Sequence, residues 1–272
     1  MLKIAVIGAG TLLGRELVDT LETRECSVLP LSHGPMSRDE EFSDLVMFAP
    51  EPSLLEGIEL VILAETPASE ALLGGFPGRV LDLRAVPEAS LEPMPLVGAW
   101  PQGRIALRAR PALEQVLATL PRLIAGLGEV SGTHLQSVSY LGDLGVDGLM
   151  EQTAAIFKGE EPPLEKLGYR AAFEVVPQIP RGRLITVKVP TFHGDLLILH
   201  LRAGEGQVLT RLEAPQGVEW RDTPATSREV AVSPQLLAHF APTEEGRAAI
   251  VTLGFDPILW GVLMPVLRLL EL

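Results

Sequence analysis

Short apolar runs alternate with helical patterns along the first third of the chain. Runs that predict buried strands lie at residues 3–8, 27–31, 60–65 and 79–84, and a helical pattern over 15–22 follows the first of them. Strands separated by helices favour a parallel, doubly wound sheet. A stretch rich in proline and glycine predicts a loop over 87–104, and apolar residues at helical spacing predict a helix over 112–125.

A different pattern begins near residue 133, where apolar and polar positions partly alternate. Such alternation predicts strands, and a helical pattern interrupts it near 147–158. We expect a mostly antiparallel sheet with one helix-covered face. A last strand, 248–255, leads into an apolar helix over 256–272. The other strand-like segments are 135–141, 183–190, 196–202, 207–212 and 229–233.

These patterns predict an α/β fold in two domains. The first is a Rossmann-like parallel sheet of the dinucleotide-binding type, formed by residues 1–118 together with 255–272. The second is an α+β domain with a mostly antiparallel sheet over residues 119–254, where we expect the catalytic-like and dimerisation surfaces.

Composition narrows the classes of partner. The 272 residues are 47% hydrophobic, with no uninterrupted apolar run long enough for a spanning helix. A net charge of −13 argues against nucleic-acid and anionic-membrane partners. The single cysteine, Cys26, excludes an intrachain disulfide and agrees with a reducing cytoplasm. We therefore expect a soluble cytoplasmic protein whose partner is a small molecule or a second copy of itself.

The first strand runs into a glycine turn, Gly8-Ala9-Gly10-Thr11-Leu12-Leu13-Gly14, that nearly matches the G-x-G-x-x-G fingerprint. Gly8 permits the tight turn and Gly10 permits close approach of backbone to a pyrophosphate. The helix that starts near Thr11 offers free N–H groups to that anion. The residues expected at the nucleotide are Gly8, Gly10, Thr11, Leu12, Leu13, Gly14 and Ser32.

The end of the second strand bears on the choice of cofactor. NAD-preferring sites usually place an acid there, but this chain has Leu31-Ser32-His33-Gly34. The absence of an acid favours NADP, with Ser32 and Arg38 near its extra phosphate, or no cofactor at all. NAD stays as an alternative.

Several collinear segments resemble the aspartate-semialdehyde dehydrogenases. "GAGTLLGRELVDTL" resembles that family's nucleotide turn, and "VLDLRAV" its strand leading to the active-site side. "SVSYLGDLGVDGLMEQTAAIF", "AAFEVVPQIP", "VKVPTFHGD" and "DPILWGVL" are similar to later family segments, so the resemblance covers most of the chain. It implies a cysteine nucleophile, a histidine acid and base, hydride transfer to NADP, phosphate as acyl acceptor, and a homodimer formed through the sheet of the second domain.

The positions that would perform this chemistry depart from the family. Aligned by the resemblance, Pro111 takes the place of the cysteine and Asp195 that of the histidine. Lys188 replaces the arginine that grips the substrate, so the planar fork that holds a carboxylate is lost. The remaining departures are Leu141 for a glutamine, Pro257 for an asparagine and Trp260 for a lysine. No catalytic residue and no metal ligand is therefore predicted.

Two classes of function stay open. The first is a relative that has lost semialdehyde oxidoreduction and either retains or has lost its NAD(P). The second is an oxidoreductase of a different carbonyl substrate that uses Lys188, His193 or Asp195 without a covalent thioester. His193 and Asp195 are two residues apart, so on a strand they would share a face and could form an acid–base pair. His134, His200 and His239 have no partner at a recognisable spacing.

Overall fold

The computed structural model describes residues 1–33, 46–65, 70–84, 89–96, 99–178 and 182–272, in two compact units. Unit 1 comprises residues 1–111 and 262–272, and unit 2 comprises residues 112–261. In the part of the chain that is described, no helix has both the length and the apolar character needed to cross a membrane.

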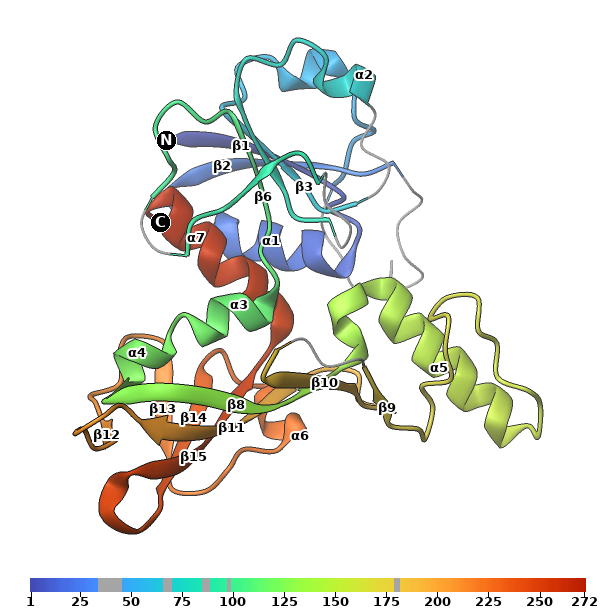
Figure 1. Cartoon of the computed structure of the whole chain (residues 1–272). Coiled ribbons are helices and arrows are strands. Elements are labelled where there is room, and N and C mark those ends of the chain that lie inside the picture. Colours follow the sequence, from blue (N-terminus) through green and yellow to red (C-terminus); the bar gives the residue numbers. More distant parts are fainter. Residues whose placement is uncertain (34–45, 66–69, 85–88, 97–98, 179–181) are drawn as a thin grey trace. The chain divides into compact units, whose positions relative to one another are not determined.

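Unit 1 is built on a six-stranded parallel sheet in the order β2-β1-β3-β4-β6-β5 (Figure 1). Ala5 and Ile7 of β1 pack with η2 and α2 on one face, while Leu17 and Leu21 of α1 are buried on the other. The parallel sheet predicted for this region is confirmed. Its elements are β1 (Leu2–Ile7), α1 (Leu12–Glu22), β2 (Cys26–Leu31), η2 (Pro52–Leu55), β3 (Leu60–Leu63), α2 (Glu70–Leu73), β4 (Arg79–Asp82), β5 (Glu92–Pro93), β6 (Ala106–Arg108) and α7 (Met264–Leu270).

Unit 2 contains a seven-stranded mixed sheet in the order β13-β14-β15-β11-β8-β10-β9. Among the described strands, β13 with β14 and β8 with β10 are parallel, and the other pairings of this sheet are antiparallel. Its elements are α3 (Ala112–Leu117), α4 (Leu120–Leu123), β7 (Ile124–Ala125), β8 (Leu127–Gln136), η3 (Val138–Leu141), α5 (Asp143–Phe157), β9 (Val176–Pro177), β10 (Leu184–Lys188), β11 (Asp195–Ala203), β12 (Thr210–Arg211), β13 (Val218–Arg221), α6 (Ser227–Val230), β14 (Leu236–Pro242), η4 (Glu244–Gly246), β15 (Ala248–Phe255) and the π-turn η5 (Leu259–Leu263).

One face of this sheet is covered, as predicted. Leu197, Val251 and Leu253 point from β11 and β15 into a core that also contains Val116 of α3 and Leu123 of α4. The opposite face is more open: Ile185 of β10 is 40% exposed and Ile250 of β15 is 39% exposed. The strand register places both isoleucines on that outer face.

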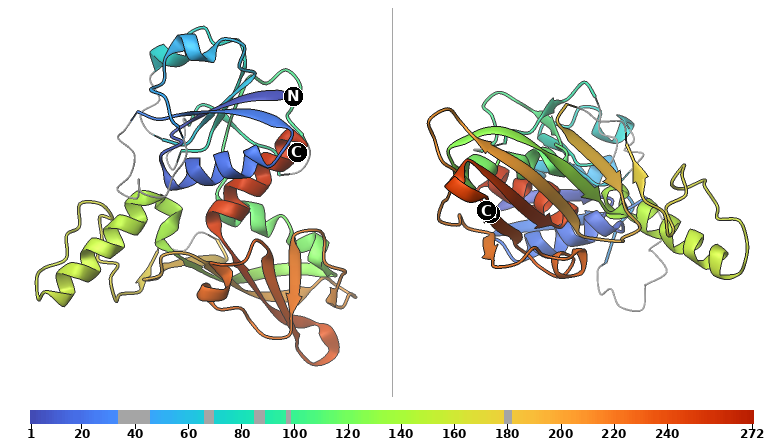
Figure 2. Two further views of the ribbon diagram at one scale, coloured as in Figure 1. Left: turned by 180° about the vertical axis from the view of Figure 1, so that it is seen from behind. Right: turned by 60° about the horizontal axis from the view of Figure 1, so that its bottom comes forward.

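Helix α5 starts earlier than the pattern indicated, at Asp143 rather than near residue 147. Two glycines in its first turns allow close packing. A Cβ at Gly145 would lie 1.9 Å from the Val138 carbonyl oxygen, and one at Gly148 would lie 2.7 Å from the Leu167 side chain. Figures 1 and 2 show α5 at the β9 end of the sheet, with the following segment of chain running back beside it.

The buried side chain of Gln152 fixes that returning segment. Its Nε2 donates to the carbonyl oxygens of Pro163 and Tyr169, at 2.9 and 2.8 Å. Its Oε1 accepts from the backbone N–H groups of Ala171 and Ala172, at 2.8 and 3.1 Å. One amide thus holds a loop of otherwise irregular chain against α5.

Several predicted elements are wrong in type or extent. The helix over 112–125 is two short helices, because Pro121 has no N–H and cannot continue the turn from α3. Residues 229–233 are not a strand: a capping box between Thr226 and Glu229 starts helix α6 instead. Segment 135–141 leaves the sheet after Gln136, 207–212 pairs only at Thr210–Arg211, and the predicted loop 87–104 contains the short strand β5.

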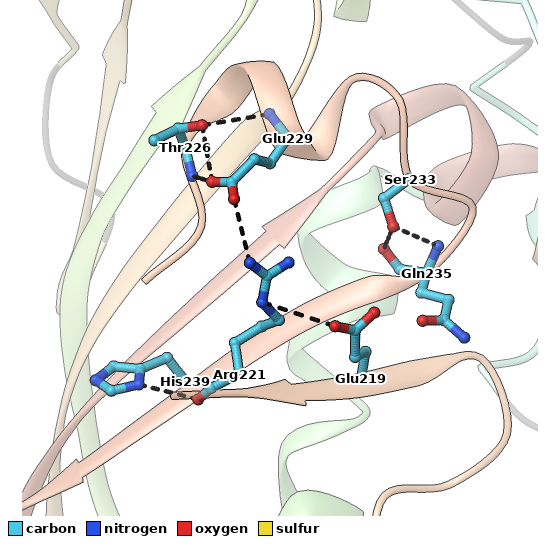
Figure 3. A network of polar contacts seen from close by, with 7 residues as sticks. All are labelled: Glu219, Arg221, Thr226, Glu229, Ser233, Gln235 and His239. Atoms are coloured by element: carbon cyan, nitrogen blue, oxygen red, sulfur yellow. Dashed lines mark hydrogen bonds and ion pairs between the residues drawn. The ribbon is translucent and has the colours of Figure 1, made fainter. Parts of the chain in front are cut away.

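Polar contacts stabilise the β13 edge of the sheet (Figure 3). Arg221 Nη2 donates to Glu229 Oε1 at 3.1 Å, and its Nε lies 3.6 Å from Glu219 Oε1. The Thr226 hydrogen bonds, and secondarily Arg221, hold the pKa of Glu229 below its ordinary value. Charged residues are common on sheet edges, where they disfavour pairing with another strand.

Candidate functional site

The glycine turn lies at the carboxyl edge of the unit 1 sheet, between β1 and α1. Gly8 has φ +98°, and the N–H groups of Gly8 and Ala9 both donate to the Leu31 carbonyl at the end of β2, at 2.8 and 2.9 Å. Neighbouring β2 and β3 lie on opposite sides of β1, which makes this the switch point of the sheet. Ligands of open α/β sheets bind in such places.

Thr11 caps the helix that follows the turn. Its hydroxyl donates to the Gly8 carbonyl at 2.8 Å and accepts from the Gly14 N–H at 3.0 Å. A Cβ at Gly14 would lie 1.8 Å from the Gly8 carbonyl oxygen, so this glycine allows α1 to start directly over β1. Leu12 and Leu13 form the first turn of α1, so the positive dipole end of this helix lies at the carboxyl edge of the sheet.

These residues fit a dinucleotide. The turn has the positive φ and close backbone approach that the fingerprint requires, and an eleven-residue helix begins directly after it. The pyrophosphate would lie at the α1 N-terminus, with Gly10, Leu12 and Leu13 next to it.

The end of β2 does meet a carboxylate, although the acid comes from another strand. Glu65, two residues after β3, accepts the backbone N–H of His33 on Oε1 at 2.9 Å, and Ser32 Oγ lies 3.5 Å from Oε2. Sequence reasoning missed Glu65. The available signal was that parallel strands end at one edge, so an acid after β3 can reach the end of β2. Arg38 lies outside the described residues.

A second polar pair lies further along the same edge, at the end of β4. Arg84 binds the fully buried Asp82 in a bidentate manner, with Nε to Oδ1 at 2.8 Å and Nη2 to Oδ2 at 2.7 Å. Such forked pairs are among the strong charged contacts in proteins. This pair fixes the chain where it leaves β4.

In unit 2, polar and titratable side chains lie together at one edge of the mixed sheet. The strand register brings together the ends of β8, β10 and β15 and the start of β11. Lys188, at the end of β10, lies with its Nζ 4.1 Å from the centroid of the Tyr169 ring and 5.5 Å from that of Tyr140. Burial, together with the neighbouring Tyr140 phenol, raises the pKa of Tyr169 to about 12. The Lys188 side chain thus lies over the rings of both tyrosines.

Asp195 is the centre of a buried network. His134 Nε2 lies 2.8 Å from Asp195 Oδ2, while the N–H and hydroxyl of Ser137 donate to Oδ1 at 2.8 and 2.6 Å. Since the Ser137 hydroxyl donates to the carboxylate, Ser139 is the donor in their 2.9 Å contact. The His134 ring also stacks on Phe255. All four polar residues of the network are at most 2% exposed.

The structure does not bring His193 and Asp195 together as the spacing suggested. His193 Nδ1 instead lies 3.9 Å from Asp256 Oδ2, and the two side chains are 33% and 17% exposed. The other Asp256 oxygen accepts the N–H groups of Ile258 and Leu259. His134, which had no partner at a recognisable spacing, is the histidine that pairs with Asp195, because β8 lies beside β11.

The remaining aligned positions lie as follows. Pro111 is exposed and directly precedes α3. Leu141 ends η3. Trp260 is 8% exposed and belongs to the apolar core of unit 2, and Pro257 is buried in the turn before it.

Cys26 lies at the start of β2, at the opposite end of the strand from the glycine turn. Its Sγ donates to the Leu21 carbonyl at 2.9 Å, and burial raises the pKa of its thiol. No group of three or more His, Cys, Asp or Glu side chains that could hold a metal occurs within the described residues.

No protein-family model matches the sequence, and no curated protein matches it. Solved structures do match. Aspartate semialdehyde dehydrogenase II of Vibrio cholerae, complexed with ASA, has a TM-score of 0.72 at 16% identity, covering 99% of this chain and 97% of its own. A probable aspartate-semialdehyde dehydrogenase from Pseudomonas aeruginosa has a TM-score of 0.72 at 20% identity, covering 98% and 97%. Aspartate semialdehyde dehydrogenase from Francisella tularensis has a TM-score of 0.72 at 14% identity, covering 98% of each chain.

Proposed function

Starting from the fold of the aspartate-semialdehyde dehydrogenases, which this chain has over nearly its full length, we propose a dinucleotide-binding protein that does not oxidise or reduce aspartate semialdehyde. The observation that supports this most directly is the state of Asp195. It occupies the place of the expected acid–base histidine, yet it is 1% exposed and bound by His134 and Ser137. A group enclosed in this way has no route to a substrate proton.

The positions of Pro111 and Cys26 also support the loss of semialdehyde oxidoreduction. A covalent route needs a thiolate at the start of the helix where Pro111 stands, and proline supplies no nucleophile. Cys26 does not substitute for it, because it lies at the amino end of β2 with a raised pKa. Ligands of such sheets bind at the carboxyl ends of the strands.

The test combines an assay with a titration. The purified full-length chain is incubated with aspartate semialdehyde, phosphate and either NADP or NAD, beside the Pseudomonas aeruginosa protein in the same buffers. We expect turnover at the level of the blank for this chain. Titration with NADH and NADPH, followed by nucleotide fluorescence and thermal melting, should show saturable binding. Phosphate-dependent turnover would overturn the proposal that the chain has lost semialdehyde oxidoreduction. Absence of binding at millimolar nucleotide would overturn the proposal that it binds a dinucleotide.

A second candidate is an oxidoreductase that acts on another carbonyl without a thioester. It is favoured by the His193–Asp256 contact, because both side chains reach solvent and a carboxylate beside an imidazole suits an acid–base pair. Lys188 would then orient an anionic group of the substrate. A screen of carbonyl compounds with both reduced nucleotides tests it, with His193→Gln as the variant and His200→Gln as the control. Turnover that survives His193→Gln would remove that residue from the proposal.

We further propose that the chain forms a cytoplasmic homodimer through the open face of the unit 2 sheet. Ile185 and Ile250 expose apolar surface there, which a second copy could cover. Sedimentation at micromolar concentration checks the dimer, and Ile250→Lys should shift it to monomer. A wild-type monomer would exclude it.

A further inference from the structure

The side chain of Glu65 crosses the top of a neighbouring strand. β1 lies between β2 and β3 in the sheet, and Ile7 of β1 pairs with both Leu31 and Leu63. Glu65 comes two residues after Leu63, yet its carboxylate reaches His33 beyond the end of β2. The carboxylate is therefore held over the carboxyl end of β1, beside the glycine turn.

The glycines of the turn make this crossing possible. A Cβ at Gly8 would lie 2.6 Å from the Glu65 backbone nitrogen and 2.7 Å from the Glu65 Cβ. A Cβ at Gly10 would lie 3.1 Å from Ser32 Oγ. The Glu65 carboxylate at the end of β2 is therefore an immediate neighbour of the glycine turn, whose backbone is expected to meet the pyrophosphate.

A carboxylate at this point can accept hydrogen bonds from the hydroxyl groups of an adenosine ribose. It has acceptor positions on both oxygens: Oε1 accepts from the His33 N–H, and among the described residues Oε2 has the long Ser32 contact alone. The ribose hydroxyls of NAD are donors that suit the remaining positions. NADP carries a phosphate at the 2′ position, and the negative charge of that phosphate would be repelled by a neighbouring carboxylate.

We propose that Glu65 selects the nucleotide, so that the chain prefers NAD(H) to NADP(H). The sequence favoured NADP because no acid follows the second strand, but the third strand supplies one to the same place. The inference rests on the proposed nucleotide binding and adds its specificity.

The experiment compares Kd values for NADH and NADPH by nucleotide fluorescence on the full-length protein. We expect wild type to bind NADH at least about tenfold more tightly than NADPH, because a contact between like charges strongly lowers affinity. Glu65→Gln keeps the size and removes the charge, and it should bring the ratio close to one. Glu22→Gln, at the exposed last position of α1, makes the same change in net charge and should leave the ratio unchanged.

The outcomes separate the specificity from the binding itself. Equal or tighter binding of NADPH by wild type overturns the role of Glu65, as does an NADH preference that Glu65→Gln does not alter. Binding of neither nucleotide overturns the proposed function instead. If Glu65→Gln does not fold, wild type is titrated with NADH and 2′-deoxy-NADH: a clear loss of affinity for the deoxy compound supports the ribose contact, and equal affinity excludes it.

Discussion

His134 Nε2 and Asp195 Oδ2 lie 2.8 Å apart, with the two side chains 3% and 1% exposed. Their strands are far apart in sequence but adjacent in the sheet, so only the folded chain reveals the pair. The network that they form with Ser137 satisfies a buried carboxylate that would otherwise be costly. At this position the chain has a buried carboxylate that is fully engaged in hydrogen bonds.

Asp195→Ala should therefore reduce stability strongly. The substitution leaves His134 and Ser137 buried without their partner, and a buried polar group left unsatisfied typically costs about 1–3 kcal/mol. Urea unfolding at neutral pH measures the change. The control is Glu174→Ala, which removes an exposed ion pair with Arg170 and should change the free energy of unfolding by less than about 0.5 kcal/mol. Similar small effects for both variants would contradict the network.

Tyr169 should ionise only at strongly alkaline pH. Tyr169 has its pKa raised to about 12, chiefly by burial, so absorbance at alkaline pH should show a late step that Tyr169→Phe removes and Tyr140→Phe retains. A phenol whose pKa is raised by folding stabilises the native state below its ordinary pKa of 10.0 and loses that contribution as pH rises toward 12. Ionisation of Tyr169 near 10 in the Tyr140→Phe variant would show that it is not enclosed.

The thiol of Cys26 should react slowly in the native protein. Burial raises its pKa above the ordinary 9.0, so less thiolate is present at pH 8 than in the unfolded chain. Labelling with a chromogenic disulfide should be slow in buffer and fast in denaturant, with no other cysteine to complicate the signal. Cys26→Ala should leave nucleotide affinity unchanged. Rapid native labelling at pH 7 would instead indicate an activated thiol.

Gly14→Ala should disrupt the glycine turn. The added methyl would lie 1.8 Å from the Gly8 carbonyl oxygen, a backbone atom that cannot move without displacing β1 or α1. Overpacking of this kind costs about 1–3 kcal/mol or more, and nucleotide affinity should fall as well. The control is Gly204→Ala, whose methyl would lie 3.2 Å from the flexible end of the Gln207 side chain and at an ordinary 3.9 Å from the Leu127 carbonyl oxygen. Equal melting temperatures for the two variants would contradict the role given to Gly14.

The parallel sheet could be predicted because its strands are continuous apolar runs, such as Ile4–Ile7 and Leu60–Leu63, buried on both faces. The wrong predictions of elements in unit 2 have local causes in the sequence. A capping box turned the strand-like residues after Thr226 into a helix, and Pro121 divided a regular apolar pattern. In both places a local hydrogen bond or its loss outweighed hydrophobic periodicity.

The candidate site was predictable only where it is local in sequence. The hydrogen bonds that shape the turn from Gly8 to Gly14 join residues within that short segment, so the sequence motif was enough to locate it. Glu65 and His134 were missed because their partners are fixed by strand order and register, which no spacing along the chain expresses. The same holds for Lys188, whose two tyrosine neighbours come from η3 and from the segment that Gln152 holds.

The π-turn at Leu259–Leu263 has a consequence for the tolerated length of the C-terminal segment. A π-turn contains one residue more than an α-helical turn, and each helical residue rotates the chain by about 100°. Leu263, at the end of the π-turn, and Val266 and Leu269 of the helix that follows are all buried in unit 1. The number of residues here sets the rotational phase between Leu263 and the buried side chains of that helix. Deletion of a single residue would turn one of them toward water, so this short stretch should tolerate substitution far better than any change in its number of residues.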